Sequence, residues 1–298
     1  MSRARAAAAD TAAALLTRVP PRWLRGIPSA QLAANRALKR RPRRFSASTR
    51  LGFTVDGDTS DLIQRYLYVF GVWEPDITAW VRDHLRPGDV AVDIGANLGY
   101  YSLLAATCVG PTGEVVAFEA VPSIADLLER NVRRNGLTVD VRRVAVGEED
   151  GTIEVHRSAG TNLGRSGTAG GVGTVSEGQV RVVRAADAID ERLWSRIRFL
   201  KVDVEGDERR VLRGLEPVLR ALPAGAVLLV EVTPDDLTAR GESAEELMAT
   251  MRGLGFTAWS IANSYRPEHY ARHRPSSPQP LRDTPAQQTD VLFVKEKS

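Results

Sequence analysis

Disulfide bonds and long apolar segments are both missing from this sequence. The 298 residues include one cysteine, Cys108, so no internal disulfide can form, and low cysteine usage favours a reducing, cytoplasmic setting. No apolar run approaches the roughly 18 residues of a membrane-spanning helix, and the alanine-rich stretch 6–16 is interrupted by Asp10. Pro20 and the arginines after it lack the small-residue cleavage pattern of a secretory signal. We therefore expect a cytoplasmic protein without a transmembrane segment.

Acidic residues are nearly absent from the first 50 positions. This segment contains 12 Lys and Arg residues and one acid, whereas the rest of the chain has more acidic than basic residues. Its pattern predicts helices at 11–17 and 31–38, followed by a basic run at 39–44. We expect a solvated basic extension over 1–50, although such an arm could contact anionic lipid, nucleic acid or an acidic partner.

Strand and helix patterns alternate from residue 87 onward. Short apolar runs are separated by amphipathic segments, which is the repeat of a doubly wound α/β domain. We therefore predict a mostly parallel seven-stranded sheet in a single domain over 51–298, with its core at about 70–262. The predicted strands are 89–94, 113–118, 139–146, 198–204, 226–232, 256–261 and 291–294.

Two segments depart from this alternation. Residues 152–157 and 179–183 alternate like exposed strands, and the stretch between them, 158–178, contains seven glycines. We predict a β-hairpin insertion with a flexible tip. The proline-rich connection 263–290, which precedes the final strand at 291–294, is long enough to be a lid.

The turn after the first predicted strand, Asp93-Ile-Gly-Ala-Asn-Leu-Gly99, is built for a nucleotide-type ligand. Small residues let a ligand approach the backbone, and the following helix offers free N–H groups. The next strand ends at Glu119, where a carboxylate can accept hydrogen bonds from both hydroxyls of a ribose. The two features together indicate an adenosine-containing ligand without choosing which one.

Charged residues on a buried strand form a third signal. The two-residue period of a strand puts Lys201, Asp203 and Glu205 on one side. Buried charges are costly unless they pair or face a ligand crevice, so the alternatives are an internal ion pair or a site for the reacting group. In the second alternative Asp203 or Glu205 is a base or an orienting group. Glu231, at the end of the next strand, is a weaker candidate.

In these segments the sequence resembles the FkbM family of S-adenosylmethionine (SAM)-dependent methyltransferases. The resemblance spans about residues 70–235 and implies a Rossmann-like class I methyltransferase fold with SAM as the methyl donor. It also implies O-methylation of a hydroxyl on a sugar, polyketide or similar metabolite. The segments that carry it are Trp73-Glu-Pro75, Leu85–Ser102, Val116–Glu119, Glu129–Gly136, Ala145–Gly147, Lys201–Gly206 and Val211–Gly214.

The resemblance also implies roles for individual residues. Glu119 binds the ribose of SAM, and Asp203 and Glu205 lie beside the transferred methyl group. Four residues surround the methionine part of SAM: Asp93, Gly95, Asn97 and Gly99.

An alcohol acceptor must lose a proton, and a carboxylate at 203 or 205 could accept it as a general base. The same carboxylates could instead hold a divalent metal, but two carboxylates do not define a complete site, so we expect none. His269 and His273 have the i,i+4 spacing of metal ligands on a helix. The arginines beside them favour a solvent-facing position.

Three other functions compete with methyl transfer to a small hydroxylated acceptor. One is a scaffold that binds SAM or adenosine without catalysis. Another is an NAD-dependent oxidoreductase, which the missing G-x-G-x-x-G motif disfavours. A nucleic-acid methyltransferase is disfavoured because the Asn-Pro-Pro-Tyr type motif is missing and the acidic body repels phosphates. We therefore expect no nucleic-acid partner.

Overall fold

A computed structural model describes residues 19–158, 174–204 and 206–297. Three sequence expectations lie outside these residues: the helix at 11–17, most of the glycine-rich tip of the hairpin, and the position of Glu205.

The centre of the fold is a mixed sheet with strand order β12-β11-β13-β10-β9-β3-β4-β5. Strands β10, β9, β3, β4 and β5 run parallel, and β13 is antiparallel to its neighbours β10 and β11. The predicted mostly parallel seven-stranded sheet is thus confirmed, with a two-residue strand, β12, added at one edge. The bounds are β3 (Val90–Ile94), β4 (Glu114–Phe118), β5 (Asp140–Arg142), β9 (Ile197–Val202), β10 (Val227–Val232), β11 (Phe256–Ser260), β12 (Gln279–Pro280) and β13 (Thr289–Lys295).

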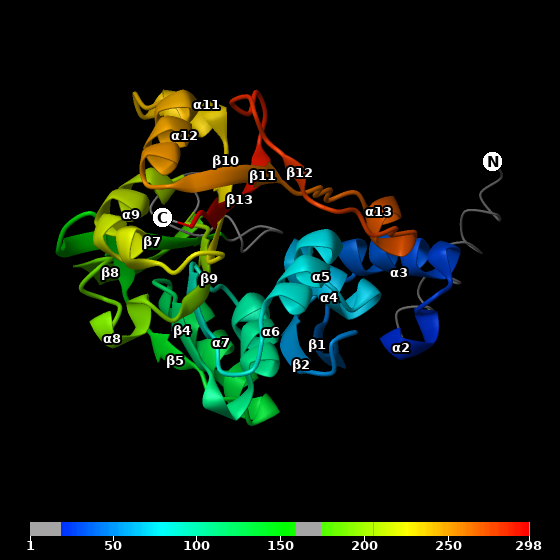
Figure 1. The fold of residues 1–298 in the computed structure, drawn as a ribbon. Coiled ribbons are helices and arrows are strands. Elements are labelled where there is room, and N and C mark those ends of the chain that lie inside the picture. Colours follow the sequence, from blue (N-terminus) through cyan, green and yellow to red (C-terminus); the bar gives the residue numbers. More distant parts are fainter. Residues whose placement is uncertain (1–18, 159–173, 205, 298) are drawn as a thin grey trace.

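Helices cover both faces of this sheet (Figure 1). The two-residue period of the strands divides the core, so that Ala91 packs on one face while Val90 and Val92 pack on the other. The first face is covered by α4 (Leu62–Phe70), α5 (Pro75–His84), α6 (Tyr100–Val109) and α7 (Pro122–Asn135). The second is covered by α8 (Glu191–Trp194), α9 (Glu208–Gly214), α10 (Glu216–Ala221), α11 (Pro234–Ala239) and α12 (Ala244–Gly253).

The strand predicted at 139–146 is wrong as a single element, because the chain leaves the main sheet after β5. Arg143 points away to form ion pairs with Asp126 and Glu129 of α7, both at 2.7 Å. Residues 145–147 then form β6 (Ala145–Gly147), which joins a second sheet with β7 (Gly151–Ser158) and β8 (Thr174–Arg184). The predicted hairpin insertion, formed by β7 and β8, is confirmed.

The described part of the basic N-terminal segment packs onto the domain. It forms α2 (Pro21–Leu24), α3 (Pro28–Arg40) and β1 (Arg44–Ser48), and β1 pairs with β2 (Thr54–Asp58). Two side-chain amides of α7 fasten this hairpin, since Asn131 accepts from Asp56 N–H (2.8 Å) and Asn135 accepts from Thr54 N–H (2.7 Å). The described basic segment is therefore part of the folded body.

The late connection returns to the same region of the molecule. Within it, α13 (Pro267–Ala271) lies beside α3 (Figure 1), and Tyr270 is buried with 1 % of its surface exposed. The Tyr66 hydroxyl donates to the backbone carbonyl of Tyr265 at 2.7 Å. The segment expected to be a lid is thus docked against the N-terminal helices.

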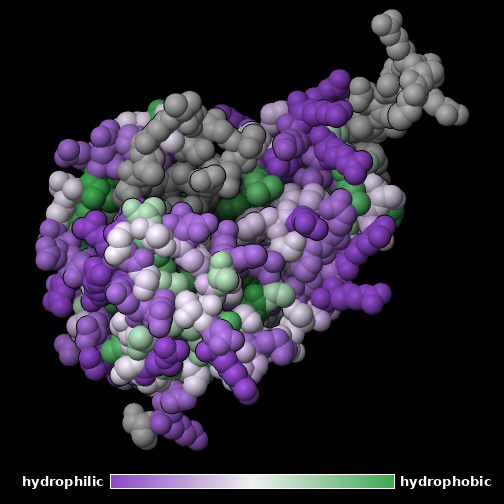
Figure 2. Space-filling model, turned by 90° about the horizontal axis from the view of Figure 1, so that it is seen from above, coloured by the Kyte–Doolittle hydropathy of each residue, from purple (hydrophilic) through white to green (hydrophobic). Residues whose placement is uncertain are grey.

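Hydrophilic residues predominate on the face seen in Figure 2, where hydrophobic residues form only small separate patches. Among the described residues the most exposed large hydrophobic side chains are Trp23 and Ile27, near the basic helices. No helix in the described ranges combines the length and the apolar character needed to cross a bilayer.

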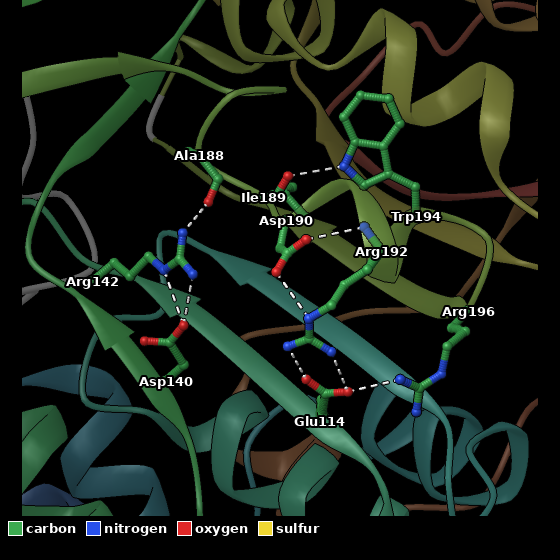
Figure 3. Close-up of polar contacts among 9 residues, drawn as sticks. All are labelled: Glu114, Asp140, Arg142, Ala188, Ile189, Asp190, Arg192, Trp194 and Arg196. Carbon is green, nitrogen blue, oxygen red and sulfur yellow. Dashed lines mark hydrogen bonds and ion pairs between the residues drawn. The ribbon is translucent and has the colours of Figure 1, made fainter.

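A network of ion pairs joins the start of β4 to the turn around α8 (Figure 3). Arg192 binds both carboxylate oxygens of Glu114 (2.9 and 2.7 Å), and Arg196 adds a third contact at 2.7 Å. Asp190 accepts from the Arg192 guanidinium at 2.8 Å. These arginines lower the pKa of Glu114, chiefly through the hydrogen bonds from Arg192. The network fixes α8 to the end of the sheet opposite the carboxyl ends of the strands.

We expect Glu114→Gln to lower the free energy of unfolding by about 1 kcal/mol or less at pH 7, as is usual for exposed ion pairs. A carboxylate whose pKa is lowered by folding stabilises the folded state at pH values above its ordinary pKa. This stabilisation is lost as the pH falls and the carboxylate is protonated. The difference from the wild type should therefore shrink between pH 7 and pH 3 in urea denaturation. Glu296→Gln is the control, because this exposed carboxylate has no ion-pair partner among the described residues. If Glu114→Gln lowered the free energy of unfolding equally at pH 7 and at pH 3, the ion-pair explanation would be contradicted.

Candidate functional site

A cleft of about 830 Å³ opens at the carboxyl ends of β3, β4, β9 and β10. Doubly wound sheets bind their ligands at this end, and the volume is typical of small-molecule sites. Its walls come from the turn after β3, the residues after β4 and β9, the small second sheet, and Tyr265 of the late segment.

The turn after β3 is held by backbone contacts on two sides. The N–H groups of Gly95 and Ala96 both donate to the carbonyl of Phe118, at 3.0 and 2.9 Å. Gly95 has a φ of +78°, and a Cβ atom there would lie 1.8 Å from the carbonyl oxygen of Asp203. Glycine is therefore required at 95 by the backbone of the neighbouring strand end, as well as by any ligand that approaches.

Glu119 lies at the cleft with 7 % of its surface exposed. One carboxylate oxygen accepts from Asn97 N–H (2.8 Å) and the other accepts from Val121 N–H (2.9 Å). Burial raises the pKa of Glu119 to about 7, against these two hydrogen bonds, which act to lower it. Each oxygen keeps a further lone pair. This pair of acceptor oxygens fits a ribose, whose two hydroxyls can donate to them.

The other residues expected around the cofactor divide into two groups. Gly95 and Asn97 line the cleft, whereas Asp93 and Gly99 lie behind the turn. Asp93 accepts a hydrogen bond from the Ser102 hydroxyl at 2.6 Å. Gly99 has a φ of +94° and leaves no room for a Cβ atom against Leu128. Asp93 and Gly99 therefore support the turn in this structure.

Lys201 and Asp203 pair with each other and also lie at the cleft. Their side chains form an ion pair of 2.8 Å, and both residues line the cleft. The Lys201 side chain is 7 % exposed and that of Asp203 is 44 % exposed. Burial acts to lower the pKa of Lys201, but the carboxylates of Asp203 and Asp93 outweigh burial and raise it. Glu205 lies outside the described residues.

A group of polar side chains around the buried Glu74 lies near Asp203, and sequence reasoning missed most of it. Glu74 accepts hydrogen bonds from Tyr101 (2.6 Å), Asn263 (3.0 Å) and Tyr265 (3.1 Å). Asn263 also donates to Asp290 at 2.8 Å. We call Glu74, Glu231 and Asp290 the acidic wall: Glu74 and Glu231 line the cleft, and Asp290 lines a neighbouring pocket.

Burial raises the pKa of all three carboxylates in the acidic wall. It raises the pKa of Glu74 and, together with the charge of Glu74, raises that of Asp290 well above its usual value. Burial and the charge of Asp203 raise the pKa of Glu231 to about 7. A carboxylate with such a pKa can accept a proton near neutral pH.

One feature of the sequence and one of the backbone mark Glu74. In the sequence, it lies within the Trp73-Glu-Pro75 segment that contributes to the family resemblance. Its φ of +40° is unusual for a residue other than glycine, and such conformations cluster at functional sites. By contrast, no local pattern marks Asn263, Tyr265 or Asp290.

The solvent-facing interpretation of His269 and His273 is wrong. Their side chains are 25 % and 12 % exposed and point toward the buried carboxylate of Asp76, at 3.3 and 3.0 Å. Helix α13 ends at Ala271, and the chain then continues without helix. Arg272 and Arg274 are exposed while His273 between them turns inward.

Comparison with known proteins identifies the family. The model of the methyltransferase FkbM domain matches residues 93–258, which is more than half of the chain. The chain belongs to the FkbM methyltransferase family. As in other FkbM-family methyltransferases, SAM is the methyl donor, and the fold is the predicted Rossmann-like α/β fold.

Two curated relatives of this FkbM-family chain are similar over most of the domain. The 31-O-demethyl-FK506 methyltransferase FkbM of Streptomyces tacrolimicus is 35 % identical over 203 residues, covering 58 % of this chain and 74 % of that protein. The hexuronic acid methyltransferase AglP of Haloferax volcanii is 26 % identical over 166 residues, covering 55 % and 66 %. Among solved structures, a SAM-dependent O-methyltransferase from Thermotoga maritima overlaps 85 % of this chain and 78 % of its own with a TM-score of 0.45 and 16 % identity.

The matched region of the FkbM domain contains the turn after β3, Glu119 and Asp203. Glu74, Tyr265 and Asp290 lie outside it. The region matched by the family model thus supplies Glu119 and Asp203, whereas Glu74 and Tyr265 reach the cleft from flanking segments.

We expect Gly95→Ala to lower the free energy of unfolding by at least about 3 kcal/mol, because a methyl group would add steric overlap with Asp203 to left-handed backbone strain. Gly136→Ala is the matched control, since Gly136 has a φ of +60° and nothing within 4 Å of a new Cβ. Strain alone should cost the control about 1 kcal/mol. If chemical denaturation gave the same decrease in the free energy of unfolding for both variants, the predicted steric overlap between residue 95 and Asp203 would be contradicted.

Proposed function

We propose that this protein transfers a methyl group from SAM to a hydroxyl oxygen of a small metabolite, of the sugar or polyketide type. The observation that carries this proposal is that one cleft holds two separate groups of carboxylates, one suited to a ribose and one suited to accepting a proton. Glu119 lies on the side of the β3 turn, and Asp203 and the acidic wall lie on the other. The names of the two curated relatives, a 31-O-demethyl-FK506 methyltransferase and a hexuronic acid methyltransferase, support the acceptor class.

On the cofactor side, Glu119 binds the ribose hydroxyls through its two oxygens. Gly95 and Asn97 face the methionine part, and Asp93 and Gly99 hold the turn in position behind them. Glu119 also fixes the turn, because it accepts from the backbone of Asn97. Bound SAM supplies an activated methyl group on a sulfonium, and the protein's task is to orient the acceptor and remove its proton.

On the acceptor side, Asp203 receives the hydrogen bond of the acceptor hydroxyl, while Lys201 fixes the carboxylate through its ion pair. The family resemblance implies the same role for Glu205. Glu231 is a second proton acceptor, because its pKa of about 7 suits proton transfer near neutral pH. A hydroxyl needs such a group, since it must lose its proton as the oxygen is methylated.

The first test is the pH dependence of SAM binding. Ribose hydroxyls donate to the ionised form of Glu119, so binding should favour deprotonation of a group with a pKa of about 7. We expect the affinity to rise about tenfold between pH 6 and pH 8, with release of a proton, in isothermal titration at several pH values.

Glu119→Gln is the matched variant for this test. It should bind SAM at least about tenfold more weakly at pH 8 and should lose the part of the pH dependence that Glu119 contributes. A variant with wild-type affinity and wild-type pH dependence would remove Glu119 from the cofactor site. Failure of the folded wild type to bind SAM would contradict the proposed function itself.

The second test separates catalysis from cofactor binding. We expect Asp203→Asn and Glu231→Gln to keep SAM affinity within about threefold and to lose about 10² to 10⁴ in turnover. The measurement is transfer of radiolabelled methyl from SAM to a panel of sugar and polyketide alcohols. Glu149→Gln, an exposed carboxylate at the cleft, is the control. Wild-type turnover in both variants would exclude these carboxylates as proton acceptors.

A further inference from the structure

A second cluster of polar side chains lies outside the cleft. It contains Asp76 near the start of α5, His269 in α13 and His273 just after α13, and none of the three lines the cleft. Their facing oxygen and nitrogen atoms all lie within 4.8 Å of one another. We propose that Asp76, His269 and His273 bind one divalent transition-metal ion of the zinc class.

The distances between these atoms match the spacing of ligands around a zinc ion. Asp76 Oδ2 is 3.3 Å from His269 Nε2 and 3.0 Å from His273 Nε2. Metal–ligand bonds of about 2.0–2.1 Å at tetrahedral angles put neighbouring ligand atoms about 3.4 Å apart. The two contacts of Asp76 Oδ2 lie within about 0.4 Å of this spacing. Three protein ligands leave a fourth position for water.

Hydrogen bonding does not explain the cluster by itself. Asp76 Oδ2, His269 Nε2 and His273 Nε2 are all buried, and none of them has a hydrogen-bond partner of acceptable geometry among the described residues. Leaving buried polar atoms in this condition is costly, and a metal ion would satisfy all three at once.

The Asp76 carboxylate is already oriented for this role. Its side chain is 1 % exposed, and its other oxygen, Oδ1, accepts from the backbone N–H (2.7 Å) and the hydroxyl (3.0 Å) of Ser276. This leaves Oδ2 directed at the two imidazoles. Hydrogen bonds that orient a ligating carboxylate are typical of metal sites in proteins.

The ion would tie the late segment to the body of the domain. Asp76 follows Glu74 of the acidic wall by two residues, while His269 follows Tyr265 by four. Tyr265 stacks on Trp73 with ring planes 9° apart and donates to Glu74. The metal site therefore clamps the two segments that form the acceptor side of the cleft, without touching the cleft itself.

The test is metal binding by the full chain, with any affinity tag removed and the protein first treated with a chelator. We expect about one equivalent of Zn²⁺ in isothermal titration. Saturating Zn²⁺ should raise Tm by about 5 °C, since a ligand that binds only the folded state stabilises it. Co²⁺ should give the visible absorption bands of a tetrahedral site, which report coordination directly and need no acceptor or SAM.

His269→Ala, His273→Ala and Asp76→Asn should each abolish the Co²⁺ bands and the Zn²⁺-dependent rise in Tm. His156→Ala is the control, because it removes a histidine from the hairpin sheet and should leave both signals unchanged. Folding of each variant is checked by its far-ultraviolet circular dichroism. If Asp76→Asn does not fold, the two histidine variants carry the comparison. A wild type that binds no Zn²⁺, or folded His269→Ala and His273→Ala variants that bind it as the wild type does, would overturn the proposal.

Discussion

The backbone contact between the turn after β3 and the end of β9 is the constraint on which the cleft depends. Asp203 N–H donates to the carbonyl of Ile94 at 3.0 Å, and Gly95 lies so close to the Asp203 carbonyl that no side chain fits between them. This contact fixes two strand ends that carry different chemistry. It places the Glu119 side of the cleft and the Asp203 side at a constant separation, as positioning of a cofactor and an acceptor requires.

Burial sets the chemistry of the carboxylates on both sides. An isolated buried carboxylate is costly, and this fold offsets the cost differently at each position. Glu119 accepts two backbone N–H groups, and Glu74 accepts from side-chain hydroxyl and amide groups. Asp203 is more exposed, and its carboxylate pairs with the buried Lys201. Burial raises the pKa of Glu119 and that of Glu231 to about 7, so these two carboxylates are poised to change charge near neutral pH.

Segments that are far apart in the chain together build the side of the cleft that contains Glu74 and Tyr265. Helix α13 packs against α3 and α4, and its Tyr270 hydroxyl accepts from the backbone N–H of Glu74. The neighbouring Asp76 cluster joins the same two segments a second time. Because these segments lie outside the region matched by the family model, they can differ between relatives while the SAM side stays the same.

The sequence by itself determined the doubly wound sheet, the hairpin insertion, the turn at 93–99 and the position of Glu119. These features depend on local patterns: apolar runs of strand length, glycines at a tight turn, and a charged residue directly after a strand. The split of the strand at 139–146 depends instead on Arg143 finding partners in α7. Likewise, only the tertiary structure brought His269 to Asp76 and Asn263 and Tyr265 to Glu74. Residues about 190 positions apart in the sequence meet there through packing that no local pattern encodes.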